Sequence, residues 1–183
     1  MTDQEIITEI RKGNDSVFKE IVMKYESQVA ATVIGMIGNC DEADDIGQEV
    51  FIRFYHSMKR FRGDSSIGTY LTRIAINLSI NELKRRKRRK LFFTDQPEND
   101  IKNHLVNNEA LPDSYDREFI HRAIQKLDTK FRSVVVLRFL DGYTTKETAA
   151  ILKIPQGTVL SRLARAQEKL KELLSPIMEE SYG

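Results

Sequence analysis

The chain has 183 residues, of which 40% are hydrophobic and 31% charged, and its formal net charge is +2. This is the balance of a globular protein with one or two domains, and no apolar run reaches the ~18 residues that a membrane helix needs. We therefore expect no membrane insertion, and the first residues do not have the pattern of a signal peptide. A lone cysteine, Cys40, excludes an internal disulfide, suits a reducing cytoplasm and, with only three scattered histidines, gives no metal-binding spacing.

The small net charge hides an uneven distribution along the chain. Residues 1–90 carry 16 basic and 13 acidic side chains, residues 91–118 carry 2 basic and 7 acidic ones, and residues 119–183 carry 11 basic and 7 acidic ones. Two basic segments thus flank an acidic one. This pattern indicates two modules that face a polyanion, joined by a segment that the polyanion repels.

The first basic segment is predicted to be helical. Apolar residues recur every three or four positions in 2–12 and in 15–34, and Gly35, Gly38 and Asn39 are expected to interrupt the pattern. Asp41 is expected to cap the next helix, because the acidic residues that follow it favour the positive end of a helix dipole. Apolar residues from Ala43 to Met58 give that helix its buried stripe.

A polar face is predicted on the helix that starts at Asp41, away from its buried stripe. Its members are Asp45, Gln48, Glu49 and Ile52. Such a face is often only solvated, and the alternative is a docking surface for a basic partner. Residues 41–44 spell a helicase signature, but no glycine-rich phosphate loop accompanies them and no nucleophile or base stands at a fixed spacing. We therefore do not expect an enzyme.

A polar loop at 62–68 and a helix of about 22 residues from Thr69 complete the first segment. They combine aromatic rings, which stack on unpaired bases, with cations that hold phosphates and an amide that can read a base edge. Phe61 and Tyr70 could equally be core residues. The residues that we predict to contact nucleic acid are Phe61, Arg62, Tyr70, Arg73 and Asn77, followed by Lys84, Arg85 and Arg86 of the cationic run 84–90.

Residues 94–117 are predicted to be an acidic flexible linker, because they are rich in Asn, Asp and Glu, contain two prolines and lack periodicity. A flexible coil of this length spans about 30 Å and an extended one roughly 90 Å. Asp95, Glu98 and Asp100 would favour a path through a channel that otherwise receives nucleic acid.

A helix-turn-helix is predicted within the last segment. Thr144 and Glu147 form a capping box that starts a short helix, and residues 153–155 make the turn. The second helix has an apolar stripe that includes Val159 and Leu163, and a polar, cationic face that can enter the major groove. That polar face contains Thr158, Arg162, Arg165 and Lys169. An ordinary amphipathic hairpin is the alternative.

These segments resemble, in order and spacing, the extracytoplasmic-function group of sigma-70 type factors. Residues 41–53 are similar to the region 2.2 motif of the family, and residues 61–86 to the region that melts and reads the −10 element. Residues 127–138 and the helix-turn-helix, with its recognition helix at 155–166, are similar to region 4. Each motif is moderately specific, whereas the ordered set is highly specific.

The resemblance implies a function and a set of partners. It implies a sigma factor that binds the β′ and β subunits of RNA polymerase core and recognises promoter DNA, in the cytoplasm with the nucleoid. Asp45, Gln48 and Glu49 match positions that grip the β′ coiled coil, and Asn77 matches a position near the pocket for a flipped −10 base. Positions that meet the −35 element are matched by Leu160, Ser161, Ala164 and Arg165, and we add Thr144, Thr158, Arg162 and Lys169. The group also commonly has anti-sigma partners.

Three residues depart from the family pattern. Leu160 stands where a cation is usual, which implies a more apolar −35 contact, and Tyr70 replaces a common tryptophan but keeps a stacking ring. Lys153 occupies a turn position where glycine is frequent. If that position needs positive φ, lysine costs about 1 kcal/mol there.

The sequence thus predicts an all-α protein of two small helical domains. Residues 1–93 form a region 2 domain and residues 118–183 a region 4 domain, joined by the linker at 94–117, with no cofactor and no metal. The alternatives are a stand-alone helix-turn-helix regulator that binds an operator as a dimer, and an adaptor that binds only other proteins.

Overall fold

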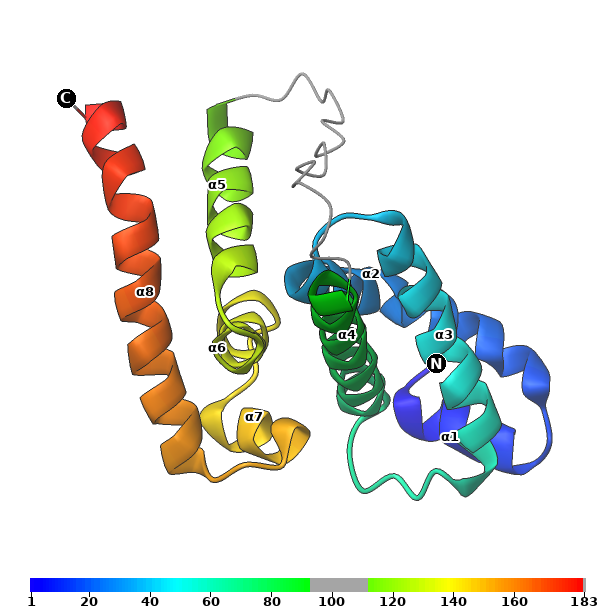
Figure 1. The fold of residues 1–183 in the computed structure, drawn as a ribbon. Coiled ribbons are helices and arrows are strands. Elements are labelled where there is room, and N and C mark those ends of the chain that lie inside the picture. The colour runs from blue at the N-terminus through cyan, green and yellow to red at the C-terminus, as the bar shows by residue number, and fades with distance from the viewer. Residues whose placement is uncertain (93–111, 183) are drawn as a thin grey trace.

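The computed structural model describes residues 1–92 and 112–182, and within these ranges it contains helices and turns but no strand (Figure 1). The all-α fold class predicted from the sequence is confirmed. The prediction for residues 94–111 lies outside the described residues. Helix α5 begins at Pro112, so the last six residues of the predicted linker, 112–117, are helical. Proline suits this first helical position because its missing N–H would have no partner within the helix.

The first module consists of four helices and two short 3₁₀ turns. The helices are α1 (Asp3–Arg11), α2 (Phe18–Ile37), α3 (Asp41–Ser57) and α4 (Ile67–Phe92), and the turns are η1 (Asp15–Val17) and η2 (Met58–Arg60). Helices α2, α3 and α4 pack against one another around side chains such as Ile21, Phe54 and Leu71, which are almost completely buried. The polar loop between α3 and α4 follows η2, as the sequence predicts.

The break predicted at Gly35, Gly38 and Asn39 occurs at Gly38, which caps the end of α2, whereas the helix continues through Gly35. A Cβ atom at this glycine would lie 3.1 Å from a methyl group of Leu140 and 3.2 Å from both methyl groups of Val136. The glycine therefore allows the second module to pack closely on α2 instead of ending the helix. The N-cap of α3 is Cys40, one residue before the predicted cap, and α4 begins two residues earlier than predicted and runs through the whole cationic segment.

The second module contains α5 (Pro112–Lys126), α6 (Thr129–Val135), a π-helical turn η3 (Val136–Leu140), α7 (Thr145–Leu152) and α8 (Gln156–Tyr182). The predicted capping box is present: the Thr144 hydroxyl accepts a hydrogen bond from the backbone N–H of Glu147, and the Glu147 carboxylate accepts one from the backbone N–H of Thr144. The carboxylate of Glu147 accepts hydrogen bonds from both the backbone N–H and the hydroxyl of Thr144, and these two bonds lower its pKa. Lys153 ends α7 with φ 54° and ψ 47°, the left-handed conformation expected for that position.

The two modules share one apolar core, and the second module supplies donors to the last carbonyl groups of α2. Gln125 donates to the carbonyl oxygens of Ile34 (3.3 Å) and Gly35 (2.7 Å), and Arg132 donates to that of Met36 (2.6 Å). Arg132 as a residue is 8% exposed, and burial lowers the pKa of its guanidinium to about 10, so the group stays protonated at neutral pH. The carbonyl groups at a helix C-terminus have no partner within the helix, so these bonds remove a large penalty for burying them.

A second set of polar contacts joins the modules nearer the middle of α2, at Gln28 and Thr32. Gln28 donates to the hydroxyl oxygens of Thr72 (3.1 Å) and Tyr143 (3.0 Å), which lie 2.9 Å from each other. Thr32 donates to the Asp141 carboxylate at 3.0 Å. Burial raises the pKa of Asp141 to about 6, against the smaller opposite effect of the Thr32 hydrogen bond. The relative placement of the modules is therefore defined by specific hydrogen bonds as well as by apolar contact.

Replacing Lys153 with glycine is expected to raise the free energy of unfolding by about 1 kcal/mol, because glycine adopts the left-handed conformation without a Cβ clash. Urea unfolding followed by circular dichroism measures this change. Ala150→Gly is the matched control in the exposed interior of α7 and should lower the stability by about 1 kcal/mol. A Lys153→Gly protein no more stable than the wild type would contradict the strain that we assign to this turn.

The raised pKa of Asp141 predicts a pH-dependent effect of Asp141→Asn. The folded protein binds the Asp141 proton more tightly than the unfolded chain, whose carboxyl pKa is near 3.8. The contribution of the protonated carboxyl to the free energy of unfolding is therefore complete below about pH 4 and is lost as the pH rises through about 6. Asp141→Asn should therefore exceed the wild type in stability by about 1–2 kcal/mol at pH 7.5, a value reduced for partial solvent screening, and by almost nothing at pH 4.

Urea titrations of both proteins at pH 4 and pH 7.5 measure the difference in free energy of unfolding between Asp141→Asn and the wild type. The other titrating groups are the same in both proteins, so their effects cancel in this difference. Asp128→Asn removes a carboxylate whose side chain is 65% exposed and is the control, which should show no comparable trend. A stability difference between Asp141→Asn and the wild type that does not change with pH would show that Asp141 stays ionised in the packed state.

Candidate functional site

The polar face of α3 lies on the surface, as the sequence predicted. Asp45 and Gln48 are exposed, and Ile52 is 50% exposed. Glu49 is partly exposed and accepts a hydrogen bond from Arg53 at 2.7 Å. Beside this face, a shallow groove between α2 and α3 is lined mostly by apolar side chains, together with Glu26, Asp44 and Gln48. The face thus offers carboxylates and an amide to another molecule, next to apolar surface.

The aromatic residues of the loop have unequal exposure. Phe61 is 8% exposed, and its ring makes edge contacts with Phe54 at a centroid distance of 6.0 Å and with Tyr70 at 5.2 Å. In this position it cannot stack on a base, which corrects the prediction made for it and agrees with the alternative that it belongs to the core. Tyr70 is half-buried, whereas Arg62 is exposed.

Helix α4 presents one amide and a series of cations. Asn77, Lys84 and Arg85 are exposed, while Arg73 is half-buried with an Nε atom that has no partner among the described residues. Arg86 is largely engaged within the protein: it donates to the Ile37 carbonyl oxygen (3.0 Å) and to the Cys40 sulfur (3.2 Å). Of the three predicted cations, Lys84 and Arg85 are thus the more accessible to a phosphate.

Glu82 organises three of the arginines in the cationic run. Its side chain is 7% exposed and lies 2.7 Å from Arg85, 3.0 Å from Arg86 and 3.5 Å from Arg89. Burial alone would raise the pKa of Glu82, but the hydrogen bonds from Arg85 and Arg86 outweigh it and lower the pKa. One buried carboxylate therefore gathers three guanidinium groups at the C-terminal part of α4, where the helix dipole also favours positive charge.

The first turns of α8 present the predicted recognition face. Ser161, Ala164 and Arg165 are exposed, and Leu160 is 57% exposed, although it is apolar. Thr158 and Arg162 are half-buried. Val159 and Ala166 are buried on the opposite side, as the predicted stripe requires.

Two of the predicted −35 residues have partners inside the module. Lys169 lies 3.8 Å from the Asp128 carboxylate and 5.4 Å from the centre of the Phe131 ring. The Thr144 hydroxyl is occupied by the capping box. Both residues are exposed, but their contacts indicate a structural role beside any contact with DNA.

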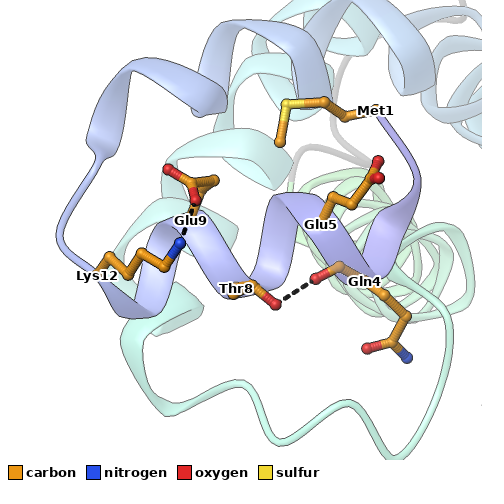
Figure 2. A pocket seen from close by; sticks show the side chains of 6 residues that line it. All are labelled: Met1, Gln4, Glu5, Thr8, Glu9 and Lys12. Atoms are coloured by element: carbon orange, nitrogen blue, oxygen red, sulfur yellow. Dashed lines mark hydrogen bonds and ion pairs between the residues drawn. The ribbon is translucent and has the colours of Figure 1, made fainter.

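The described residues show no small-molecule site of evident chemistry. The hollow in Figure 2 is wide open and is lined by the solvent face of α1, where Lys12 pairs with Glu9 at 2.7 Å and Thr8 donates to the Gln4 carbonyl oxygen. No group of three or more potential metal ligands lies together in the part of the chain that the structure describes. The exposed polar face of α3 and the cationic faces of α4 and α8 are therefore the surfaces through which this helical protein can contact other macromolecules.

The comparisons with known proteins agree with this interpretation. Residues 21–89 match the family described as Sigma-70 region 2, and residues 123–172 match Sigma-70, region 4. The RNA polymerase sigma-H factor of Pseudomonas aeruginosa is 31% identical over 98% of this chain and 97% of its own length. The ECF RNA polymerase sigma-E factor of Escherichia coli is 33% identical, with 97% of both chains covered.

Two solved structures share the fold, each with 23% sequence identity and a TM-score of 0.70. One is the sigma factor RpoE in complex with the anti-sigma factor NepR from Bartonella quintana, which covers 86% of this chain and is itself covered to 96%. The other is CnrH in complex with the cytosolic domain of CnrY, with coverages of 95% and 97%.

The chain belongs to the extracytoplasmic-function group of the sigma-70 family. It is a sigma factor, a non-enzymatic protein that binds RNA polymerase core and directs promoter-specific transcription initiation. The alternatives of a stand-alone operator-binding regulator and of a protein-only adaptor are thereby set aside. No helix of the described residues has the length and apolar character needed to cross a bilayer.

Sequence reasoning missed the residues that join the two modules, chiefly Gln28, Gln125, Arg132 and Tyr143. Most of these are ordinary polar residues in a helical pattern, and their partners lie far away in the sequence. Arg132 carried one usable signal, because it is a lone cation in the otherwise almost wholly apolar run 131–137. A buried charge in such a run needs several acceptors, which here come from α2 and from the end of α5.

Proposed function

We propose that residues 1–92 dock on polymerase core through Asp45, Gln48, Glu49 and Ile52 of α3 and capture −10 DNA along α4. The observation that supports this most is that the docking face and the cationic run are exposed on different helices, so both can be used at once. Carboxylates on α3 would meet a basic partner, and Asn77 with the exposed cations of α4 would meet an unpaired strand.

We propose that α8 reads the −35 element in the major groove. Ser161, Ala164 and Arg165 form its exposed face, and arginine can bind guanine through two parallel hydrogen bonds. Leu160 adds an apolar group at a position where it can meet a thymine methyl. Together with the docking on core, this contact fixes the register of the enzyme on the duplex.

Capture of the melted strand must be driven by binding energy. Unstacking costs a few kcal/mol per base step, and the family is not enzymatic. Contacts made only with the separated strand, at Asn77, Tyr70 and Arg62, would favour the open promoter. The result is a shift in population toward the open state.

The packed arrangement of the two modules must change for this function. The Cα atoms of α4 and α7 approach within 8 Å, as do those of α7 and α8, and α7 itself is only about 11 Å long. Only one short helix therefore separates α4 from α8 where they come closest, whereas two turns of DNA measure about 70 Å. We infer that the modules separate before both elements are bound.

We further propose that an anti-sigma protein binds the packed arrangement. The two solved relatives with the same fold are complexes with an anti-sigma factor in one case and with the cytosolic domain of CnrY in the other. A protein that contacts both modules together would oppose their separation and hold the factor away from promoters. When active, the factor would be associated with the nucleoid.

Charge reversal at Asp45 and Glu49 to lysine is expected to abolish binding to polymerase core, because like charges at a docking surface cost several kcal/mol. Unfolding in urea should change by less than about 0.5 kcal/mol, since both residues lie on the surface. Co-purification with core polymerase measures the binding. Glu20→Lys, an exposed reversal in the first turn of α2, is the control and should bind normally. Unchanged core affinity of the double variant would remove the docking proposal.

Arg165→Ala is expected to weaken binding to a duplex with the −35 sequence by about 1–3 kcal/mol and to relax selectivity at one base pair. Lys169→Ala, which removes a cation already engaged by Asp128 and Phe131, should have a smaller effect that is the same on all sequences. Affinities for a set of singly substituted duplexes measure both. An equal loss for Arg165→Ala on every duplex would mean that this residue contacts only phosphate.

A further inference from the structure

Helix α1 spans the two ends of the loop between η2 and α4. At its C-terminal end, Arg11 donates to the backbone carbonyl oxygens of Arg62 (3.3 Å) and Phe61 (3.5 Å), where the loop begins. At its N-terminal end, the Asp3 carboxylate lies beside the backbone N–H of Ile67, the first residue of α4, which helps to lower the pKa of Asp3. Between these contacts the helix is about 12 Å long. Figure 2 shows the loop running along α1 from one end to the other.

Both ends of α1 are firmly placed. Ile6, Ile7 and Ile10 are buried in the core, and Thr2 and Glu5 form a capping box at its start. Asp3 also accepts hydrogen bonds from Lys24 at 2.8 Å and from the Tyr25 hydroxyl at 2.7 Å. Burial would raise the pKa of Asp3, but these bonds outweigh it and lower the pKa. The carboxylate is thus ionised at neutral pH and suited to accept the N–H of Ile67.

The loop between these two contacts has little support of its own. Arg62, Gly63, Asp64 and Ser66 are exposed, and Gly63 has a φ of 82° with no neighbour within 4 Å of the position of a Cβ atom. Phe61 fixes one end in the aromatic cluster, and the Ser66 hydroxyl accepts the N–H of Thr69 at the other. Five residues, 62–66, therefore bridge two points whose separation α1 sets.

We propose that α1 is a strut that holds this loop in the conformation that captures an unpaired −10 base, with Arg11 and Asp3 as positioning residues. This inference rests on the proposed capture of −10 DNA by the loop and α4. Neither residue needs to touch DNA. Without the strut, the loop samples more conformations, and ordering it on binding costs conformational entropy. The predicted effect is therefore on strand capture and base preference, while core docking and −35 binding are unaffected.

The test uses holoenzyme reconstituted from the full chain and polymerase core. The probe is a single-stranded DNA pool, randomised over six positions, from which the wild-type holoenzyme selects its preferred sequence. Arg11→Ala holoenzyme should bind the selected strand about 5–10-fold more weakly and discriminate less between bases at the captured position. Arg11→Lys should recover part of the loss, because an ammonium group can donate to the same carbonyl oxygens. Core affinity and urea unfolding of Arg11→Ala should match the wild type.

Lys12→Ala is the matched control, because it removes the neighbouring cation, which pairs with Glu9 on the solvent face (Figure 2). It should leave affinity and base preference unchanged. Wild-type capture by Arg11→Ala, or an equal loss with Lys12→Ala, would overturn the strut. Asn77→Ala separates the two proposals: if it weakens capture and Arg11→Ala does not, only the strut fails. If the wild-type holoenzyme selects no sequence, capture itself fails and the strut fails with it.

Discussion

The carbonyl groups at the C-terminal end of α2 constrain the whole molecule. They are the last four of a 20-residue helix that ends inside the protein, and each needs a donor from elsewhere. The Ile34 carbonyl accepts hydrogen bonds from the backbone N–H of Gly38 and from the Gln125 side chain, which also donates to the Gly35 carbonyl. The Met36 carbonyl accepts from Arg132, and the Ile37 carbonyl accepts from Arg86. Two of these donors belong to the second module and one to the cationic run. The helix end is therefore the point at which α4 of the first module meets α5 and α6 of the second.

This interface uses internal surfaces and leaves the functional ones accessible. Asp45 on α3, Asn77 on α4 and Arg165 on α8 are all exposed while Gln28, Thr72 and Tyr143 join the modules. The packing therefore restricts the distance between the DNA-binding surfaces and not the surfaces themselves. Its polar contacts also suit a reversible interface, because water can replace each lost hydrogen bond at small net cost once the modules part. The apolar contact of Gly35 with Val136 and Leu140 has no such replacement and opposes separation.

Local features of the fold were predictable because they depend on residues close in sequence. The capping box at Thr144 and the exposed face at Asp45 follow from residue spacing alone, whereas the positive φ of Lys153 was suggested only by the glycine that is frequent there in the family. Gly35 was misread because the same residue type ends a helix or admits a close neighbour, and the neighbour lies about a hundred positions away. Phe61 was ambiguous for a similar reason, since burial against Phe54 and Tyr70 is decided by tertiary packing. The roles of the surface residues in binding core and DNA stay predictions.

The cationic run shows how the fold divides charge between structure and binding. From the sequence its seven cations look equivalent, but Arg85, Arg86 and Arg89 surround the buried carboxylate of Glu82, and Arg86 also contacts Glu42 at 3.5 Å. Lys84, Lys87 and Arg88 are exposed and have no ion pair with a described residue. A phosphate that approaches α4 therefore meets a few uncompensated charges that project from a helix held in place by the compensated ones. Each phosphate contact made by a cation steepens the dependence of the logarithm of the binding constant on the logarithm of the salt concentration by about 0.9. Because fewer cations are uncompensated than the sequence contains, we expect a weaker salt dependence and a weaker electrostatic attraction of this helix for a strand than its composition suggests. In the capture of −10 DNA that we propose, selectivity would then come more from the shape of the loop and from Asn77 than from charge.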